Sequence, residues 1–284
     1  MRARPARPAQ PAPSLPAARC IVAYAPRDAV RASLRKTFPR RRARLVLTRT
    51  PADFERVFRR ELVDAALVDV VHARDDTWRV VALARDFPSA AFYGIAPYRG
   101  ADAAAIARCA AQEFADILAD GVDDAVARDL VLRDAFSSRF ATALETPPPS
   151  LRLTTPVQRA AWALVVGHAG RAMRTEAIAR ALGLTREHLS RNFSRDGGPN
   201  LKRIIDLVRL LAAAELAKNP GYDVADVAKV LRFASPSHLA TTAQRVAGTK
   251  PASLARLHGV DLIKRFSDGR GRSRGERPAR GPVA

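Results

Sequence analysis

Short apolar runs alternate with segments of helical period along residues 20–122. Unbroken apolar runs are typical of strands buried on both faces of a sheet, whereas apolar residues that recur once per helical turn are typical of amphipathic helices. The runs are CIVAYA, ARLVLT, VDAALVDVV, AAFYGIA and FADILA. The segments between them are DAVRASLRKTF, PADFERVFRRE, TWRVVALARDF and ADAAAIARCAAQ. This strict alternation predicts an α/β doubly wound domain at residues 20–145, with a fifth helix inside 123–144.

The pattern changes after the sequence TPPPS at residues 146–150. Three consecutive prolines cannot continue a helix, so this stretch is expected to be a semi-rigid linker. Beyond it the spacing of apolar residues is helical throughout, which predicts an all-α domain at residues 151–258. The expected helices are 156–166, 174–182, 185–193, 200–218, 224–231 and 235–246, with a final short one after Pro251.

The two ends of the chain have no pattern that would pack a core. Residues 1–19 alternate Arg, Pro and Ala, and residues 259–284, above all those from Ser267 onward, are rich in Arg and Gly. We expect a basic disordered arm and a basic disordered tail. The N-terminus lacks the apolar run of a signal peptide, and no stretch approaches the roughly 20 apolar residues of a membrane span. A cytoplasmic, nucleoid-associated location without a membrane partner is therefore expected.

Charge then narrows the class of partner. The chain carries a formal net charge of +20, and residues 151–284 hold 24 basic against 10 acidic residues. An excess of this size, placed mostly in the helical half, favours nucleic acid as the partner. Cys20 and Cys109 are the only cysteines, too few for a disulfide framework and without zinc-ligand spacing to histidine. We expect no metal and no cofactor.

The segment TEAIARALGLTREHLSRNF, residues 175–193, has the spacing of two short helices that meet across a tight turn. Gly183 can adopt the positive φ of the corner, and the Thr185 side chain can cap the second helix. Leu189 and Phe193 are expected to lie in the core. A helix of this width fits the major groove of double-stranded DNA. Its expected DNA-contacting residues are Thr185, Arg186, Glu187, His188, Ser190 and Arg191.

A similar arrangement follows in DVADVAKVLRFASPSHLATTAQRVAGTKP, residues 223–251. Phe233 is expected to fill the corner, Ser235 to cap the second helix, and Pro236 to occupy its first position. The expected DNA-contacting residues here are Ser235, Ser237, His238, Thr241, Thr242 and Arg245. Thr241 and Arg245 are better placed for phosphates than for bases. The alternative for His188 and His238 is that they are histidines on a helix surface that make no contact with DNA.

These two units together resemble the AraC/XylS family, whose DNA-binding domain joins two helix-turn-helix units by a long helix. The matching stretches are IARALGLTREHLSRNF, RLLAAAELAKNPGYDVADVA, FASPSHL and GTKP. The resemblance implies that one chain reads two successive major-groove segments. It also implies looser packing in the second unit, where Arg232 replaces the family's usual Gly, and where Leu239 and Ala243 replace aromatic residues.

The five-strand pattern of the N-terminal half resembles the response-regulator receiver, a flavodoxin-like fold. Asp69 ends the third strand, where that family keeps its phosphoacceptor and where ligands of open α/β sheets gather. The family's acidic pair after the first strand is replaced by Tyr24, Ala25 and Pro26, with only Asp28 nearby.

Two further parts of a working receiver are missing from the sequence. The hydroxyl expected after the fourth strand is Ala96, and no Lys occurs between Lys36 and Lys202. Without a metal site or a cationic partner, Asp69 is predicted to be inactive as a phosphoacceptor. We expect a degenerate receiver-like domain that serves in dimerisation or senses another signal. The alternative for Asp69 is a carboxylate that caps the following helix.

Rival function classes have weaker support. The sequence has no nucleophile elbow, no HExxH motif, and APRDAV instead of glycines after the first strand, so an enzyme is not expected. A non-specific nucleoid-associated or RNA-associated protein would explain the charge without explaining two well-spaced helix-turn-helix units. We therefore expect a sequence-specific transcription regulator, with a homodimer through the N-terminal domain and RNA polymerase left open as further partners.

Overall fold

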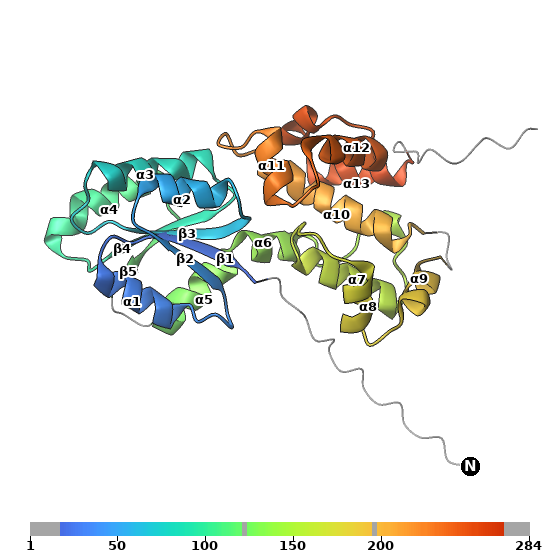
Figure 1. The fold of residues 1–284 in the computed structure, drawn as a ribbon, viewed down its shortest axis with the longest axis horizontal. Coiled ribbons are helices and arrows are strands. Elements are labelled where there is room, and N and C mark those ends of the chain that lie inside the picture. Colours follow the sequence, from blue (N-terminus) through green and yellow to red (C-terminus); the bar gives the residue numbers. More distant parts are fainter. Residues whose placement is uncertain (1–17, 121–123, 195–197, 270–284) are drawn as a thin grey trace, which may run out of the picture.

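The computed structural model describes residues 18–120, 124–194 and 198–269. Its N-terminal half is built on a parallel five-stranded sheet in the order β2-β1-β3-β4-β5 (Figure 1). The strands are β1 (Cys20–Tyr24), β2 (Arg44–Thr48), β3 (Val63–Asp69), β4 (Ala91–Ala96) and β5 (Asp116–Ala119). This order is that of flavodoxin-like folds. The predicted α/β doubly wound fold is confirmed.

Helices cover both faces of this sheet, and successive residues of a strand face different helices. They are α1 (Asp28–Thr37), α2 (Pro51–Phe58), α3 (Asp75–Asp86), η1 (Gly100–Asp102), α4 (Ala103–Ala110) and α5 (Asp124–Asp134). Val22 and Ala66 pack in one cluster with Phe54 of α2 and Val80 of α3. Ile21 and Ala65 pack in another with residues of α1 and α5. All seven residues of β3 are buried because this central strand is covered on both faces.

The fifth predicted helix is two helices. The chain bends at Ala135 and continues as α6 (Phe136–Ala143). The backbone N–H of Ser137, in the first turn of α6, donates to Asp64 Oδ1 of β3 at 2.9 Å. A free amide at a helix start needs such an acceptor, and this one lies far away in the sequence. Local periodicity over residues 123–144 therefore could not reveal the break.

The C-terminal half is helical, as predicted, with small shifts at the helix ends. It consists of η2 (Pro149–Leu151), α7 (Pro156–Gly167), α8 (Thr175–Ala181), α9 (Arg186–Ser194), α10 (Leu201–Leu216), α11 (Val224–Val230), α12 (Pro236–Ala247), η3 (Pro251–Arg256) and α13 (Gly259–Ser267). The long helix α10 lies between the α7–α9 group and the α11–α13 group (Figure 1). Of its 16 residues 13 are buried, so it is the centre of this half.

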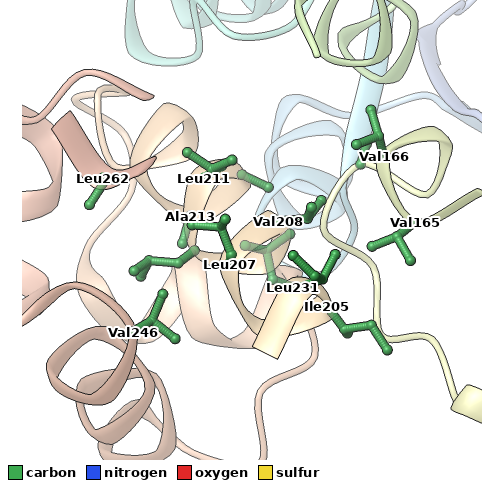
Figure 2. Close-up of a cluster of buried hydrophobic side chains, with 14 of the residues drawn as sticks. Val165, Val166, Ile205, Leu207, Val208, Leu211, Ala213, Leu231, Val246 and Leu262 are labelled. Carbon is green, nitrogen blue, oxygen red and sulfur yellow. The ribbon is translucent and has the colours of Figure 1, made fainter. Parts of the chain in front are cut away.

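The core of the helical half is built around α10. Figure 2 shows side chains of α10, among them Leu207, Val208 and Leu211, packed with Val165 of α7 and Val246 of α12. Phe136 and Phe140 of α6 belong to the same buried cluster. The core of the helical half thus begins ahead of the predicted linker at 146–150. The predicted domain boundaries themselves stay predictions.

Helix α13 corrects the expectation of a disordered tail from residue 259. Leu262 and Phe266 are buried, and the guanidinium of Arg203 on α10 lies 4.8 Å from the centre of the Phe266 ring. The segment folds because these apolar residues, one helical turn apart, meet α10 and α12. Nearly all of the predicted arm, residues 1–17, and the rest of the tail, from 270, lie outside the described residues. Within the described ranges, no helix combines the length and apolar character that crossing a bilayer requires.

One contact between the two halves is a buried carboxylate. Asp64 of β3 is fully buried, and its Oδ2 accepts from the Cys20 N–H and from Arg171 Nη2, both at 2.7 Å. Arg171 lies in the turn between α7 and α8 and also donates to Ser137 Oγ at 2.8 Å. A buried carboxylate requires this compensation. Arg171 therefore anchors the start of the helical half to the central strand.

A second contact is made by the loop between α10 and α11, residues 219–222. Asn219 accepts from the Ser89 N–H at 2.8 Å, and the hydroxyl of Tyr222 donates to the Phe58 carbonyl at 3.1 Å. A side chain at Gly221 would come within 2.6 Å of the Phe87 ring, so only glycine fits there. This loop is seated tightly against the ends of α2 and α3.

Candidate nucleic-acid interface

The carboxyl edge of the sheet holds an ion-pair cluster centred on Arg27, directly before α1. Nε and Nη2 of Arg27 donate to Oδ2 and Oδ1 of Asp69, each at 2.7 Å. The same guanidinium lies 3.1 Å from a carboxylate oxygen of Asp120, which follows β5. Hydrogen bonding to Asp69 raises the pKa of Arg27, so the guanidinium is charged at any physiological pH. One side chain thus joins the ends of three strands.

This cluster corrects two expectations about Asp69. Asp69 was expected to have no cationic partner, yet Arg27 donates to both of its oxygens. The signal for this contact is the arginine of APRDAV, immediately after the first strand. The helix-cap alternative is also wrong. Asp69 Oδ1 accepts from the Val71 N–H at 3.2 Å, whereas α3 begins only at Asp75.

The residues at this edge do not fit the Mg²⁺ site of a working receiver. Mg²⁺ needs carboxylate oxygens that are free to coordinate it, and those of Asp69 are directed at Arg27. The Asp28 side chain is 80% exposed and pairs with Arg49 instead. Among the described residues, no group of three or more His, Cys, Asp or Glu side chains could hold a metal ion.

The first helix pair, α8 and α9, meets across the corner predicted from sequence. Gly183 has a φ of 67°, in the left-handed region that favours glycine. The Thr185 hydroxyl accepts from the His188 N–H at 3.1 Å and so caps α9. Leu189 and Phe193 are fully buried, as expected. The turn and the cap therefore orient the opposite face of α9 toward solvent.

The second helix pair, α11 and α12, has the same shape with a different corner. Arg232 adopts a φ of 55°, the conformation for which the resembling family has Gly. Ser235 caps α12 by accepting from the His238 N–H at 3.1 Å, and Pro236 is the first helical residue. Leu239 and Ala243 are both buried, so the absence of aromatic residues opens neither position to solvent.

Sequence comparison agrees with this geometry. Residues 178–256 match a family model described as a helix-turn-helix domain, and the match runs from within α8 to the end of η3. These residues form an AraC-type helix-turn-helix domain. The assignment supports a DNA-binding regulator. A solved structure of full-length FixJ from B. japonicum is similar at 11% identity, covering 66% of this chain and 93% of that chain with a TM-score of 0.37. No curated protein matches the chain.

In the AraC-type domain, α9 presents all of its predicted DNA-contacting residues to solvent. Thr185, Arg186, Glu187, His188, Ser190 and Arg191 are exposed. Arg186 forms an exposed ion pair with Glu176 of α8 at 3.3 Å, a contact of little strength in water. Four of these side chains line a shallow surface hollow: Arg186, Glu187, Ser190 and Arg191. This face of α9 is polar and exposed to solvent.

The corresponding face of α12 agrees with the prediction only in part. Ser235, Ser237, His238 and Thr241 are exposed, but Thr242 is 1% exposed. The expectation that Thr242 faces DNA is wrong, because it shares the core-facing side of α12 with Leu239, Ala243 and Val246. Arg245 is half-buried and forms an ion pair with Asp206 of α10.

Two charged residues of α10 that the sequence analysis did not select support this second unit. Arg209 is 8% exposed, donates to the carbonyls of Leu231 and Arg232, and lies 3.9 Å from the centre of the Phe233 ring. Burial lowers the pKa of Arg209 and raises that of Asp206. Their only sequence signal was a pair of charges within the otherwise apolar run IIDLVRLL.

Proposed function

We propose that the protein is a sequence-specific transcription regulator whose two helix-turn-helix units read adjacent major-groove segments of double-stranded DNA. The single observation that carries this proposal is the exposed face of α9, with Arg186 and Arg191 on a helix capped by Thr185. Arginine can donate two parallel hydrogen bonds to the O6 and N7 atoms of guanine, which makes it the commonest base reader in the major groove.

The two units are proposed to have unequal shares in recognition. In α9 both arginines are exposed, and Arg191 has no ion-pair partner among the described residues. In α12 the one arginine is held by Asp206, and the exposed predicted contacts include no Arg or Lys: Ser235, Ser237, His238 and Thr241. We assign base reading chiefly to α9, and to α12 phosphate contacts through Thr241 and Arg245 with a smaller share of base contacts.

The test is selection of bound fragments from random duplex DNA with the full chain. An enriched sequence with two segments, bound with an affinity that falls steeply as salt rises, is the expected result. Competition with unrelated duplexes then separates this proposal from non-specific nucleic-acid binding. Equal competition by any duplex or by RNA would favour the non-specific alternative and overturn sequence-specific reading.

We further propose that the α/β domain works without phosphorylation and contributes to a homodimer. Arg27 already supplies the positive charge that faces Asp69, which is the support for the first part. The homodimer is checked by sedimentation of the full chain over a range of concentrations. Contact with RNA polymerase, the absence of catalysis and of cofactors, and a cytoplasmic, nucleoid-associated location stay predictions.

A further inference from the structure

A cavity of about 640 Å³ lies between the two halves of the molecule. It is lined by the loop after α3, by α6, by the C-terminal part of α10 and by the first turns of α13. Small-molecule sites have volumes of roughly 300–1,000 Å³ and form preferentially where domains meet. The cavity therefore has the size and position of a ligand site, and none of its lining residues belongs to the proposed DNA-reading faces.

Most of the wall is apolar. Phe136 and Phe140 of α6 are stacked with ring centres 5.8 Å apart, and Leu211 of α10 and Ile263 of α13 also line the cavity. Val260 of α13, another lining residue, is 76% exposed. An exposed valine on a helix whose Leu262 and Phe266 are buried leaves apolar surface in water at this point. A ligand with an apolar body would cover it.

The polar part of the wall is positively charged. Arg139 of α6 donates to the Ser89 carbonyl but forms no ion pair among the described residues. The nearby carboxylate of Asp134 is engaged elsewhere, since its oxygens accept from Tyr93 at 2.9 Å and from Arg133 at 3.1 Å. Lys218 of α10 is paired with Glu215 at 2.7 Å. The charged side chains that line the cavity are Arg139, Lys218 and Glu215, so its wall carries an excess of one positive charge.

We propose that this cavity binds a small amphipathic carboxylate. Its apolar body lies among Phe136, Phe140, Leu211 and Ile263, and its anionic group binds Arg139. An anion is favoured because a guanidinium and a carboxylate form charge-assisted hydrogen bonds, whereas a cation would be repelled and a neutral group would leave the charge unpaired. Because the loop after α3 contributes beside α6, α10 and α13, the bound ligand contacts both halves of the molecule.

The experiment is isothermal titration of the full chain, without DNA, with decanoate and with decyltrimethylammonium, which has the same chain length and the opposite charge. We expect saturable one-to-one binding of decanoate, at least tenfold tighter than that of the cation. Arg139→Gln should weaken decanoate at least tenfold, and Ala143→Trp, which fills the cavity from α6, should abolish binding. Arg79→Gln and Ala104→Trp, exposed positions outside the cavity, are the matched controls.

The proposal is overturned by any of three results: no saturable binding of decanoate, equal affinity for the two probes, or unchanged decanoate binding in both Arg139→Gln and Ala143→Trp. Circular dichroism of each variant establishes that a loss of binding is not a loss of fold. Since DNA is absent from the titration, failure here leaves the proposed DNA binding untouched, and failure of DNA binding leaves this site untouched.

Discussion

The two helix pairs of the AraC-type domain have the same shape but are embedded differently in the molecule. Directly before the pair α8–α9, Arg171 joins the chain to Asp64 of the α/β domain. The pair α11–α12 is held at several points: Asp226 of α11 by Arg59, Arg232 at the corner by Glu61 at 3.8 Å, and Arg245 of α12 by Asp206. Among the described residues Arg191 of the first pair has no ion-pair partner, whereas Arg232 and Arg245 of the second pair each face a carboxylate.

The difference indicates that the helix-turn-helix shape alone does not determine how strongly a unit discriminates between DNA sequences. A recognition helix contributes to sequence discrimination through side chains whose donors are free to meet base edges. Arginines already bound to carboxylates must give up those contacts first. On the proposed function, the second pair is better suited to fix the position of the domain on DNA, and the first to recognise sequence.

The largest expected effect tests the anchor of the first pair. Asp64→Ala should lower the free energy of unfolding by about 3–5 kcal/mol, because it leaves Arg171 and two buried N–H groups without their acceptor. Asp226→Ala, which removes the more exposed pair with Arg59, should cost roughly 1 kcal/mol. Urea denaturation of both variants measures the two values. Similar losses of unfolding free energy in the two variants would mean that the helix pairs α8–α9 and α11–α12 are anchored equally strongly.

The next effect concerns DNA. Arg191→Ala should weaken binding to the selected duplex by about 1–3 kcal/mol and change the preferred base at one position. Arg245→Ala should leave the preferred sequence unchanged, because this side chain is held by Asp206. Arg79→Ala, on the α/β domain, is the control for loss of charge alone. A changed preference in Arg245→Ala with none in Arg191→Ala would reverse the assignment of the two units.

The corners of the two pairs predict stability changes of opposite sign. Gly183→Ala should lower the free energy of unfolding by about 1–2 kcal/mol, since a side chain there meets open space but an unfavourable backbone. Arg232→Gly should raise it by about 1 kcal/mol, because glycine relieves the left-handed strain at φ 55°. Thermal unfolding of the two variants side by side checks the signs.

No effect at all is expected from a phosphodonor. Incubation of the purified chain with acetyl phosphate and Mg²⁺ should add no phosphoryl group to Asp69, because Arg27 occupies both carboxylate oxygens. The DNA affinity of the unsubstituted chain should be the same before and after this incubation. Asp69→Asn, which has no carboxylate to phosphorylate, is the control. A Mg²⁺-dependent mass increase on Asp69 that shifts affinity tenfold would show a working receiver. Mass spectrometry and a DNA titration provide the two measurements.

Periodicity sufficed for the sheet, the order of helices and both corners, because each depends on neighbours in sequence. It failed where a partner lies far along the chain. Asp64 accepts from the Ser137 N–H in the first turn of α6. Leu262 and Phe266 of α13 belong to the buried cluster that is built around α10. The prediction for Thr242 was wrong for a different reason. Its polar side chain predicted exposure, whereas its position on the core-facing side of the helix predicted burial, and it is buried.

The glycine in the loop between α10 and α11 has a consequence for the shape of a binding site. Gly221 brings that loop against Phe87 with no room for a side chain. The α/β domain therefore limits how far α11 and α12 can move toward it. The separation of α9 and α12 is then set by α10 and by this contact; if both helices read DNA as proposed, the DNA has to match that separation. On the proposed function, inserting half a helical turn between the two segments of an operator would turn one of them away from its reader. The α/β domain would thus govern operator choice through spacing, without contacting a single base.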